Sequence, residues 1–156
     1  MIKQAGLAVL MSAALITTAP MGNAATVLTL EGGLVGLQHI WHFVPTQLQG
    51  DLCKSPNNCQ PVDYFAFPGG AFTDQGAAKV VQAIDALPDD EQIVLFGHSQ
   101  GGQVVYSDLR RFAADPANAP DPSRLTWVSI GNPENAYGGR RNKTETPVQW
   151  LPPDTA

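Results

Sequence analysis

The sequence of 156 residues predicts an α/β fold, in which helices flank a mostly parallel sheet. Short apolar runs rich in β-branched residues alternate with stretches whose apolar side chains recur at helical spacing. One such run, residues 93–96, leads through a glycine-rich turn directly into a helical pattern. Strands that alternate with helices in this way are typical of parallel sheets with crossover connections.

The elements can be assigned in chain order. We expect four strands, over residues 26–31, 62–67, 93–96 and 125–130. A helix is expected over residues 73–87 with Thr73 as its N-cap, and another over residues 103–112. Between the first two strands, Pro45 is expected to limit any helix to the residues before it.

Residues 97–101 read Gly-His-Ser-Gln-Gly and lie between the third strand and the next helix. In this context the pattern Gly-x-Ser-x-Gly predicts a nucleophile elbow with Ser99 as the nucleophile. Gly97 and Gly101 are expected to be glycine because the strained chain passes too close to itself for side chains. The N–H of Gln100 would then point at a developing oxyanion. The alternative is an ordinary turn in which Ser99 only caps the helix.

The glycine pair after the first strand is a candidate for a second oxyanion donor. Hydrolases with such an elbow place a second N–H on a loop that follows an early strand. Gly33 is therefore the candidate donor, next to Gly32. The alternative, a turn without a catalytic role, stays open.

A base for Ser99 is not evident. The histidines are His39, His42 and His98, and all of them precede Ser99. The usual chain order is Ser, then Asp or Glu, then His. We expect the ring of His98 to point away from the serine hydroxyl, and the acid and the histidine of a triad to be missing from this chain. His39 and His42 lack a third ligand, so no metal site is predicted, and no organic cofactor is implied.

Residues 1–25 have the features of a signal peptide. Lys3 precedes an alanine-rich apolar run that is short for a membrane span, and small residues precede a cleavage point after Ala25. Cleavage would leave residues 26–156 as one domain, secreted or in the cell envelope. An uncleaved anchor and a buried first helix are the alternatives.

Cysteine usage and charge agree with an exported protein that binds no nucleic acid. Cys53 and Cys59 are predicted to form a disulfide in an oxidising compartment, with free thiols as the alternative. The net charge is −5, and no basic run marks a surface for nucleic acid.

The elbow, together with Ile130-Gly-Asn-Pro133 and the pair Gly138-Gly139, resembles the PE-PPE domain of mycobacteria and their relatives. This is a serine α/β-hydrolase domain similar to cutinases, and the resemblance covers its front portion only, so the fold is expected to be truncated at the C-terminus. It implies an esterase or lipase that cleaves acyl esters through Ser99, with Gln100 and the Gly32–Gly33 loop in the oxyanion hole. It also implies an acyl ester or lipid substrate and association with envelope lipids.

Two other functions stay open at this point. One is a catalytically inactive, exported lipid-binding protein or envelope remnant, in which an apolar groove is kept without turnover. The other is acyl transfer through the same acyl-enzyme. The usual family members carry a PE or PPE module where this sequence has its signal-like segment. The oligomeric state is not indicated.

Overall fold

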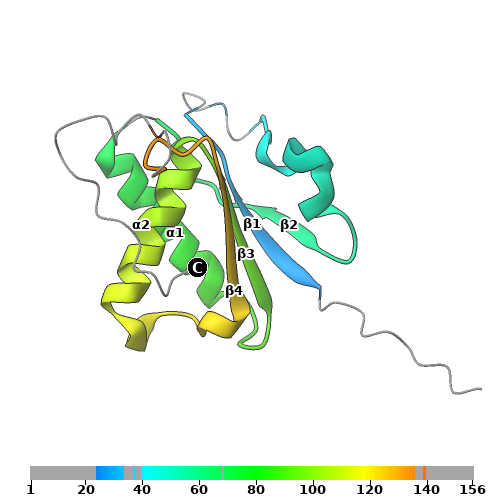
Figure 1. Ribbon diagram of the computed structural model, residues 1–156, viewed down its shortest axis with the longest axis vertical. Coiled ribbons are helices and arrows are strands. Elements are labelled where there is room, and N and C mark those ends of the chain that lie inside the picture. The colour runs from blue at the N-terminus through cyan, green and yellow to red at the C-terminus, as the bar shows by residue number, and fades with distance from the viewer. Residues whose placement is uncertain (1–23, 34–36, 38–39, 68, 136–138, 140–156) are drawn as a thin grey trace, which may run out of the picture.

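The structure, a computed structural model, describes residues 24–33, 37, 40–67, 69–135 and 139. Its four strands form one parallel sheet in the order β2-β1-β3-β4, which confirms the predicted α/β class. Helices α1 and α2 cover one face of the sheet, and the 3₁₀ segment η2 lies on the other (Figure 1). The elements are β1 (Ala25–Leu30), η2 (Val44–Cys53), β2 (Asn58–Pro61), α1 (Gly70–Asp85), β3 (Gln92–His98), α2 (Gln100–Ala114), η3 (Pro116–Asn118), η4 (Pro122–Arg124) and β4 (Leu125–Ile130).

The two central strands, β1 and β3, are apolar on both faces. Their side chains alternate between the faces, as the pleat of a strand requires. The side chains that join the core under the helices are Leu28, Leu30, Ile93 and Leu95. Val27 and Phe96 lie on the opposite face, where they pack with Val44 of η2. Burial on both sides explains why the sequence shows nearly continuous apolar runs here.

The predicted strand over residues 62–67 is wrong in position, because the strand beside β1 is β2. The alternation of apolar side chains does mark burial, because Val62, Tyr64 and Ala66 are all buried. However, the last pair of the ladder joins Thr29 to Pro61, one residue before β1 ends. Beyond that point the segment continues without a partner strand, so its inward side chains pack on the helices instead.

Helix α1 begins three residues before the predicted N-cap. Gly69 is its N-cap, with a φ of 153° that favours glycine. The Thr73 hydroxyl donates to the carbonyl oxygen of Gly69 at 3.3 Å, within the first turn. The helix start is therefore set by the backbone at Gly69 and not by a hydroxyl cap.

Pro45 starts a helix, where we had expected it to end one. It occupies the first turn of η2, in which its fixed φ is suitable and its missing N–H is not needed. The 3₁₀ geometry is interrupted at Leu48, Gln49 and Gly50, which all have positive φ. The segment thus turns back toward the sheet.

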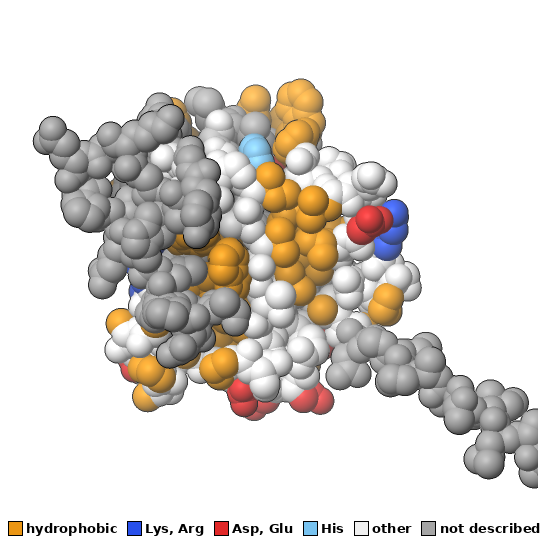
Figure 2. Space-filling view, viewed as in Figure 1, with side chains coloured by type: hydrophobic (Ala, Val, Ile, Leu, Met, Phe, Trp, Pro, Cys, Tyr) orange, Lys and Arg blue, Asp and Glu red, His pale blue; other side chains and the backbone are white. Residues whose placement is uncertain are grey.

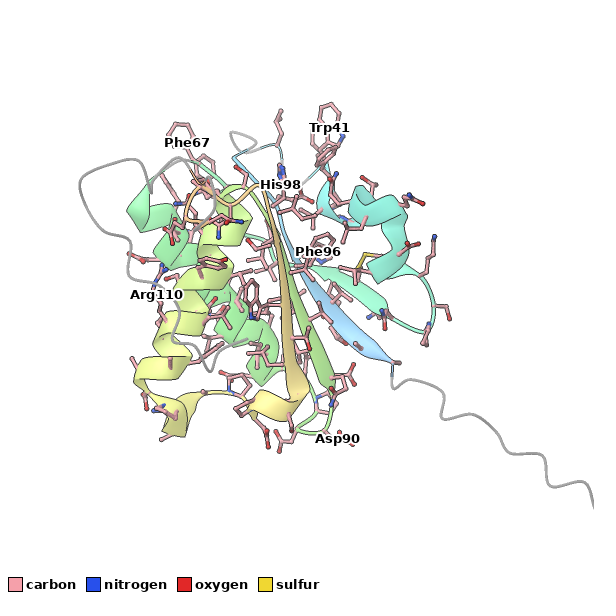
Figure 3. All side chains as sticks on the ribbon, viewed as in Figure 1. Trp41, Phe67, Asp90, Phe96, His98 and Arg110 are labelled. Carbon is pink, nitrogen blue, oxygen red and sulfur yellow. A yellow bond between two sulfur atoms is a disulfide. The ribbon has the colours of Figure 1, made fainter. Side chains whose placement is uncertain are left out.

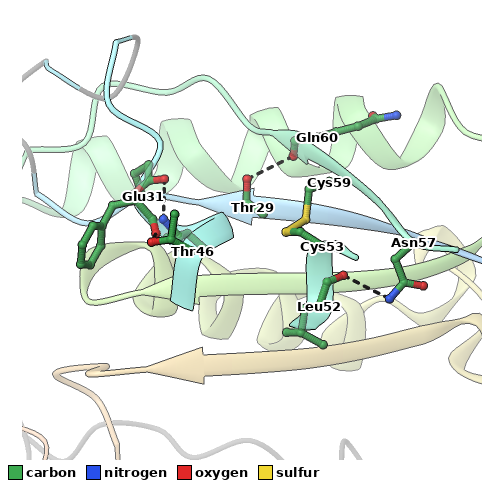
Figure 4. Close-up of a disulfide and its surroundings, with 10 residues drawn as sticks. Thr29, Glu31, Thr46, Leu52, Cys53, Asn57, Cys59 and Gln60 are labelled. Carbon is green, nitrogen blue, oxygen red and sulfur yellow. Dashed lines mark hydrogen bonds between the residues drawn. A yellow bond between two sulfur atoms is a disulfide. The ribbon is translucent and has the colours of Figure 1, made fainter. Parts of the chain in front are cut away.

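The predicted disulfide between Cys53 and Cys59 is confirmed (Figure 4). Cys53 ends η2 and Cys59 lies in β2, with a Cα–Cα distance of 5.3 Å. Next to it, the side-chain amide of Asn57 donates to the carbonyl oxygen of Leu52 at 3.1 Å. The bridge therefore fastens η2 to the edge strand of the sheet.

Among the described residues, no helix has the length and apolar character needed to cross a bilayer. The predicted signal peptide falls almost entirely on residues 1–23, which lie outside the described part of the chain. Strand β1 begins at Ala25, the predicted cleavage position.

Helix α2 carries a fully buried carboxyl group, Asp108. Neither of its oxygens has a hydrogen-bond partner, and the Arg111 guanidinium lies 3.6 Å from one of them. Burial raises the pKa of Asp108 to about 8, with Arg111 acting in the opposite direction. The folded state therefore favours the protonated carboxyl.

We predict that Asp108→Asn stabilises the protein at neutral pH. Below the ordinary pKa of 3.8 both states hold the proton, and between 3.8 and about 8 only the folded state does. Wild-type stability should therefore fall as pH rises through this window, by up to about 1.4 kcal/mol per pH unit, and then level off.

Urea unfolding of both proteins across this window measures the difference, which should grow until the pH reaches the folded-state pKa. Asp85→Asn, an exposed change on α1, is the control for the loss of a charge. A difference that does not depend on pH would contradict the prediction.

Candidate active site around Ser99

Ser99 is the single residue between β3 and α2, and its backbone is strained. It has φ 53° and ψ −112°, backbone angles that residues other than glycine rarely adopt. Its N–H donates to the carbonyl oxygen of Ile130 at 2.8 Å, and its own carbonyl accepts from Gln103 at 3.3 Å. Its side chain makes no capping hydrogen bond, so the alternative of a mere helix cap does not describe this turn.

The glycines on either side of Ser99 are required by close backbone contacts. A Cβ at Gly97 would lie 2.5 Å from the carbonyl carbon of Gly101. A Cβ at Gly101 would lie 2.7 Å from the carbonyl carbon of Leu30. Both distances are too short for real side chains. The expected need for glycine at these positions is thus confirmed.

Ser99 opens into a pocket of about 360 Å³ at the carboxyl ends of β1 and β3. The pocket is lined by Glu31, Gly32, Gly33, Trp41, Phe43, His98 and Ser99. Ligands of open α/β sheets bind at this end of the strands. The structure therefore brings Ser99 and Gly33, two of the predicted site residues, to one cavity.

Gln100, the third predicted participant, does not contribute its side chain to the pocket. Its amide donates to the carbonyl oxygen of Phe67, and the side chain is buried. Gln100 is the first residue of α2, where backbone N–H groups have no acceptor within the helix. Its backbone N–H is thus the only group available for the predicted role.

His98 lines the same pocket as Ser99, and the expectation that its ring points away from the serine hydroxyl stays a prediction. A Cβ at Gly32 would lie 3.1 Å from both His98 Nδ1 and the Cβ of Ser99. Phe43 packs edge-on against the His98 ring, with 5.9 Å between centroids. Among the described residues, none forms a hydrogen bond with the Ser99 hydroxyl, His98 included.

Glu31 is a pocket residue that the sequence analysis did not single out. Its Oε1 accepts from the N–H of Val44 at 2.9 Å, and its carbonyl oxygen accepts from the Tyr64 hydroxyl. Burial raises the pKa of Glu31, against the hydrogen bonds from Val44 and Phe43 and the charges of His42 and His98. Its other carboxyl oxygen is buried without a partner.

Glu31 therefore ties three segments together: the end of β1, the start of η2 and the stretch after β2. A signal for it exists in the sequence. It is the only Asp, Glu, Lys or Arg between residues 26 and 50, and it stands between a buried strand and a glycine pair.

The described residues after β4 hold the start of α2, and none of them lines the pocket. The Asn132 side chain donates to the carbonyl oxygen of Gly102 at 3.1 Å. Glu134 accepts from Gln103 at 3.2 Å and pairs with Arg110 at 3.0 Å. Ile130, Asn132 and Glu134 thus form hydrogen bonds with Ser99 and the first turn of α2.

The acids after Ser99 do not supply a partner for it in the described part of the chain. Asp108 is fully buried, and Glu134 is paired with Arg110. Glu145 and Asp154, like His39, lie outside the described residues. His42 is exposed, and no three His, Cys, Asp or Glu side chains of the described residues gather into a metal-binding group.

Comparison with known proteins gives one family. The sequence matches the PE-PPE domain over residues 48–150. It is 35% identical over 94 residues to PE family protein PE3 of Mycobacterium tuberculosis, a match that covers 54% of this chain and 20% of that protein. It is 44% identical over 67 residues to Esterase PE16 of the same organism, covering 42% of this chain and 13% of that protein. The chain thus spans a fifth or less of these curated relatives.

A solved structure shows the same fold. The metagenomic carboxyl esterase MGS0156 matches with a TM-score of 0.53 and 16% identity, over 85% of this chain and 40% of that one. At this level of identity the likeness concerns the fold alone. The architecture is that of the α/β hydrolases.

We predict that Glu31→Ala destabilises the protein by about 1–3 kcal/mol, because it leaves a buried N–H of Val44 without its acceptor. Glu31→Gln keeps an acceptor oxygen and should cost clearly less. Urea unfolding at neutral pH measures both. Equal losses for the two variants would show that the carboxylate charge, and not the hydrogen bond, matters at this position.

Proposed function

The chain belongs to the PE-PPE domain family, and we propose that it is a serine esterase that cleaves acyl esters through Ser99. The observation that carries the proposal is the strained turn at Ser99, whose hydroxyl is unused by the helix and opens into a pocket beside Gly33. The name of the relative Esterase PE16 supports the reaction class.

The proposed reaction proceeds in two halves. Ser99 Oγ forms a bond with the ester carbonyl carbon while its proton passes to a base, and the carbonyl electron pair moves to the oxygen. The N–H groups of Gln100 and Gly33 would stabilise this oxyanion. Its collapse breaks the bond to the alcohol, which leaves with the proton. Water then attacks the acyl-enzyme in the same manner and releases the acid.

The pocket walls suit the acyl part of such a substrate. Trp41 and Phe43 form an aromatic wall, and both belong to a stretch without charged side chains. Glu31 holds the start of η2 through Val44 and so fixes this wall relative to the Gly32–Gly33 loop. The wall would orient the acyl chain, while the loop would orient the carbonyl oxygen.

The proton acceptor is the component that Ser99 lacks among the described residues. A serine hydroxyl without a base is a weak nucleophile, and removing a triad member leaves a small fraction of the activity. We therefore expect this chain to react slowly with acylating probes, and we expect free imidazole, which can supply the missing base, to accelerate the reaction.

Labelling with a fluorophosphonate, followed by peptide mapping, tests the proposal. The wild-type chain should be labelled at Ser99, faster with imidazole, and Ser99→Ala should not be labelled. Ser107→Ala, on α2 and outside the pocket, is the matched control. Absence of labelling even with imidazole would contradict the proposal and favour the non-catalytic, lipid-binding alternative. Transfer of the acyl group to an added alcohol would instead favour acyl transfer.

We also propose that the protein is exported, with cleavage after Ala25. The Cys53–Cys59 disulfide supports this, because such bridges persist in oxidising compartments. The intact mass of the protein recovered from the cell wall and from the medium measures it. We expect a species that begins at Thr26, and a species that retains residues 1–25 would contradict the cleavage.

A further inference from the structure

The exposed large hydrophobic side chains of the described residues are confined to two stretches, one after β1 and one after β2. They are Leu37, Ile40, Trp41, Phe43, Leu48, Phe65 and Phe67. We call Trp41, Phe43, Phe65 and Phe67, together with the neighbouring aliphatic Ile40, the aromatic rim. Trp41 and Phe67 lie at the same end of the molecule with His98 between them (Figure 3). At this edge, hydrophobic side chains stand out beside the histidine on the molecular surface (Figure 2).

The aromatic rim flanks Ser99 on two sides. On one side, Trp41 and Phe43 line the Ser99 pocket itself. On the other side, the backbone of Phe67 accepts a hydrogen bond from Gln100, the residue after Ser99. The rim therefore has two members on the pocket wall and another that contacts the residue next to Ser99.

Two rings of the rim, Phe65 and Phe67, pack against each other while they remain exposed. Phe65 and Phe67 stack with 6.1 Å between centroids, and Phe72 contacts them at 5.2 and 5.7 Å. Even so, exposure ranges from 40% at Phe67 to 79% at Ile40. An apolar surface that is held in place and left open is typical of an interaction site.

The charge pattern selects the kind of partner. No Asp, Glu, Lys or Arg occurs in residues 32–50 or 64–73, which contain the whole rim. The chain as a whole carries a net charge of −5. An anionic membrane would therefore find no cation on the rim and would be repelled by the rest of the protein. An uncharged apolar surface has no such penalty, and tryptophan is favoured at apolar–water boundaries.

We propose that the aromatic rim adsorbs to the surface of neutral lipid, such as an acylglycerol emulsion, so that the Ser99 pocket opens at the lipid–water boundary. Adsorption needs no proton acceptor, so it does not depend on turnover at Ser99. The proposed function and this surface can therefore fail separately.

Flotation with an emulsion of triolein tests the proposal. Ser99→Ala is the starting protein, so that no lipid is consumed, and it should float with the emulsion regardless of salt. Adding Trp41→Ser or Phe67→Ser should weaken binding about tenfold each, since each removes a ring that the lipid would cover. Vesicles that contain anionic phosphatidylglycerol should not bind better than neutral phosphatidylcholine vesicles.

The control is Phe112→Ser, which removes a ring from the apolar groove between α2 and β4. It should leave flotation unchanged, with urea unfolding used to compare the folding of all variants. As a second readout, brominated triglyceride should quench the fluorescence of Trp41, and Trp41→Phe should lose this quenching while it still floats.

Four results would overturn the proposal: no flotation, binding that requires anionic lipid and low salt, loss of binding in Phe112→Ser instead of the rim variants, and self-association through the rim without lipid binding. Labelling of Phe67→Ser by a water-soluble fluorophosphonate, on the Ser99 background, should match the parent chain. A normal label without flotation would reject the surface and keep the esterase proposal.

Discussion

The site depends on the backbone contact between β1 and the first turn of α2. Gly101 lies so close to the carbonyl group of Leu30 that no side chain fits between them, and Gly97 is equally close to Gly101. Because no side chains separate these segments, the end of β1 is placed directly beside Ser99. The Gly32–Gly33 loop, which follows β1 directly, therefore lines the pocket. A larger residue at either glycine would move the turn away from the loop.

The polar groups near this contact are arranged to keep it rigid. Glu31 follows Leu30 and uses its carboxylate to hold the start of η2, while Tyr64 holds its carbonyl oxygen. On the other side, Asn132 holds the carbonyl of Gly102. Tertiary contacts that over-determine a turn are what allows strained backbone such as that of Ser99 to persist. The pocket is thus formed by a network of neighbours and not by the five-residue motif alone.

Much of this could be predicted from the sequence, and the failures have physical causes. The fold class, the turn at Ser99, the requirement for Gly97 and Gly101, and the disulfide follow from local chemistry, which a sequence displays directly. The ladder of β2 was misplaced because alternation at Val62, Tyr64 and Ala66 reports burial and says nothing about which strand lies alongside. Glu31 and the rim residue Trp41 were missed as site residues because their roles come from tertiary contacts around the pocket, which no periodicity reveals.

The hydrogen bond from the Ser99 N–H to Ile130 has a consequence for how the serine acquires its geometry during folding. Its partner lies at the end of β4, the last strand of the described sheet. The positive φ of Ser99 is unfavourable in isolation, so it is maintained only after the chain has closed this long loop and β4 has docked. A partly folded chain would therefore carry the motif without the turn. The strained geometry of Ser99 therefore depends on the docking of β4 as well as on the local motif.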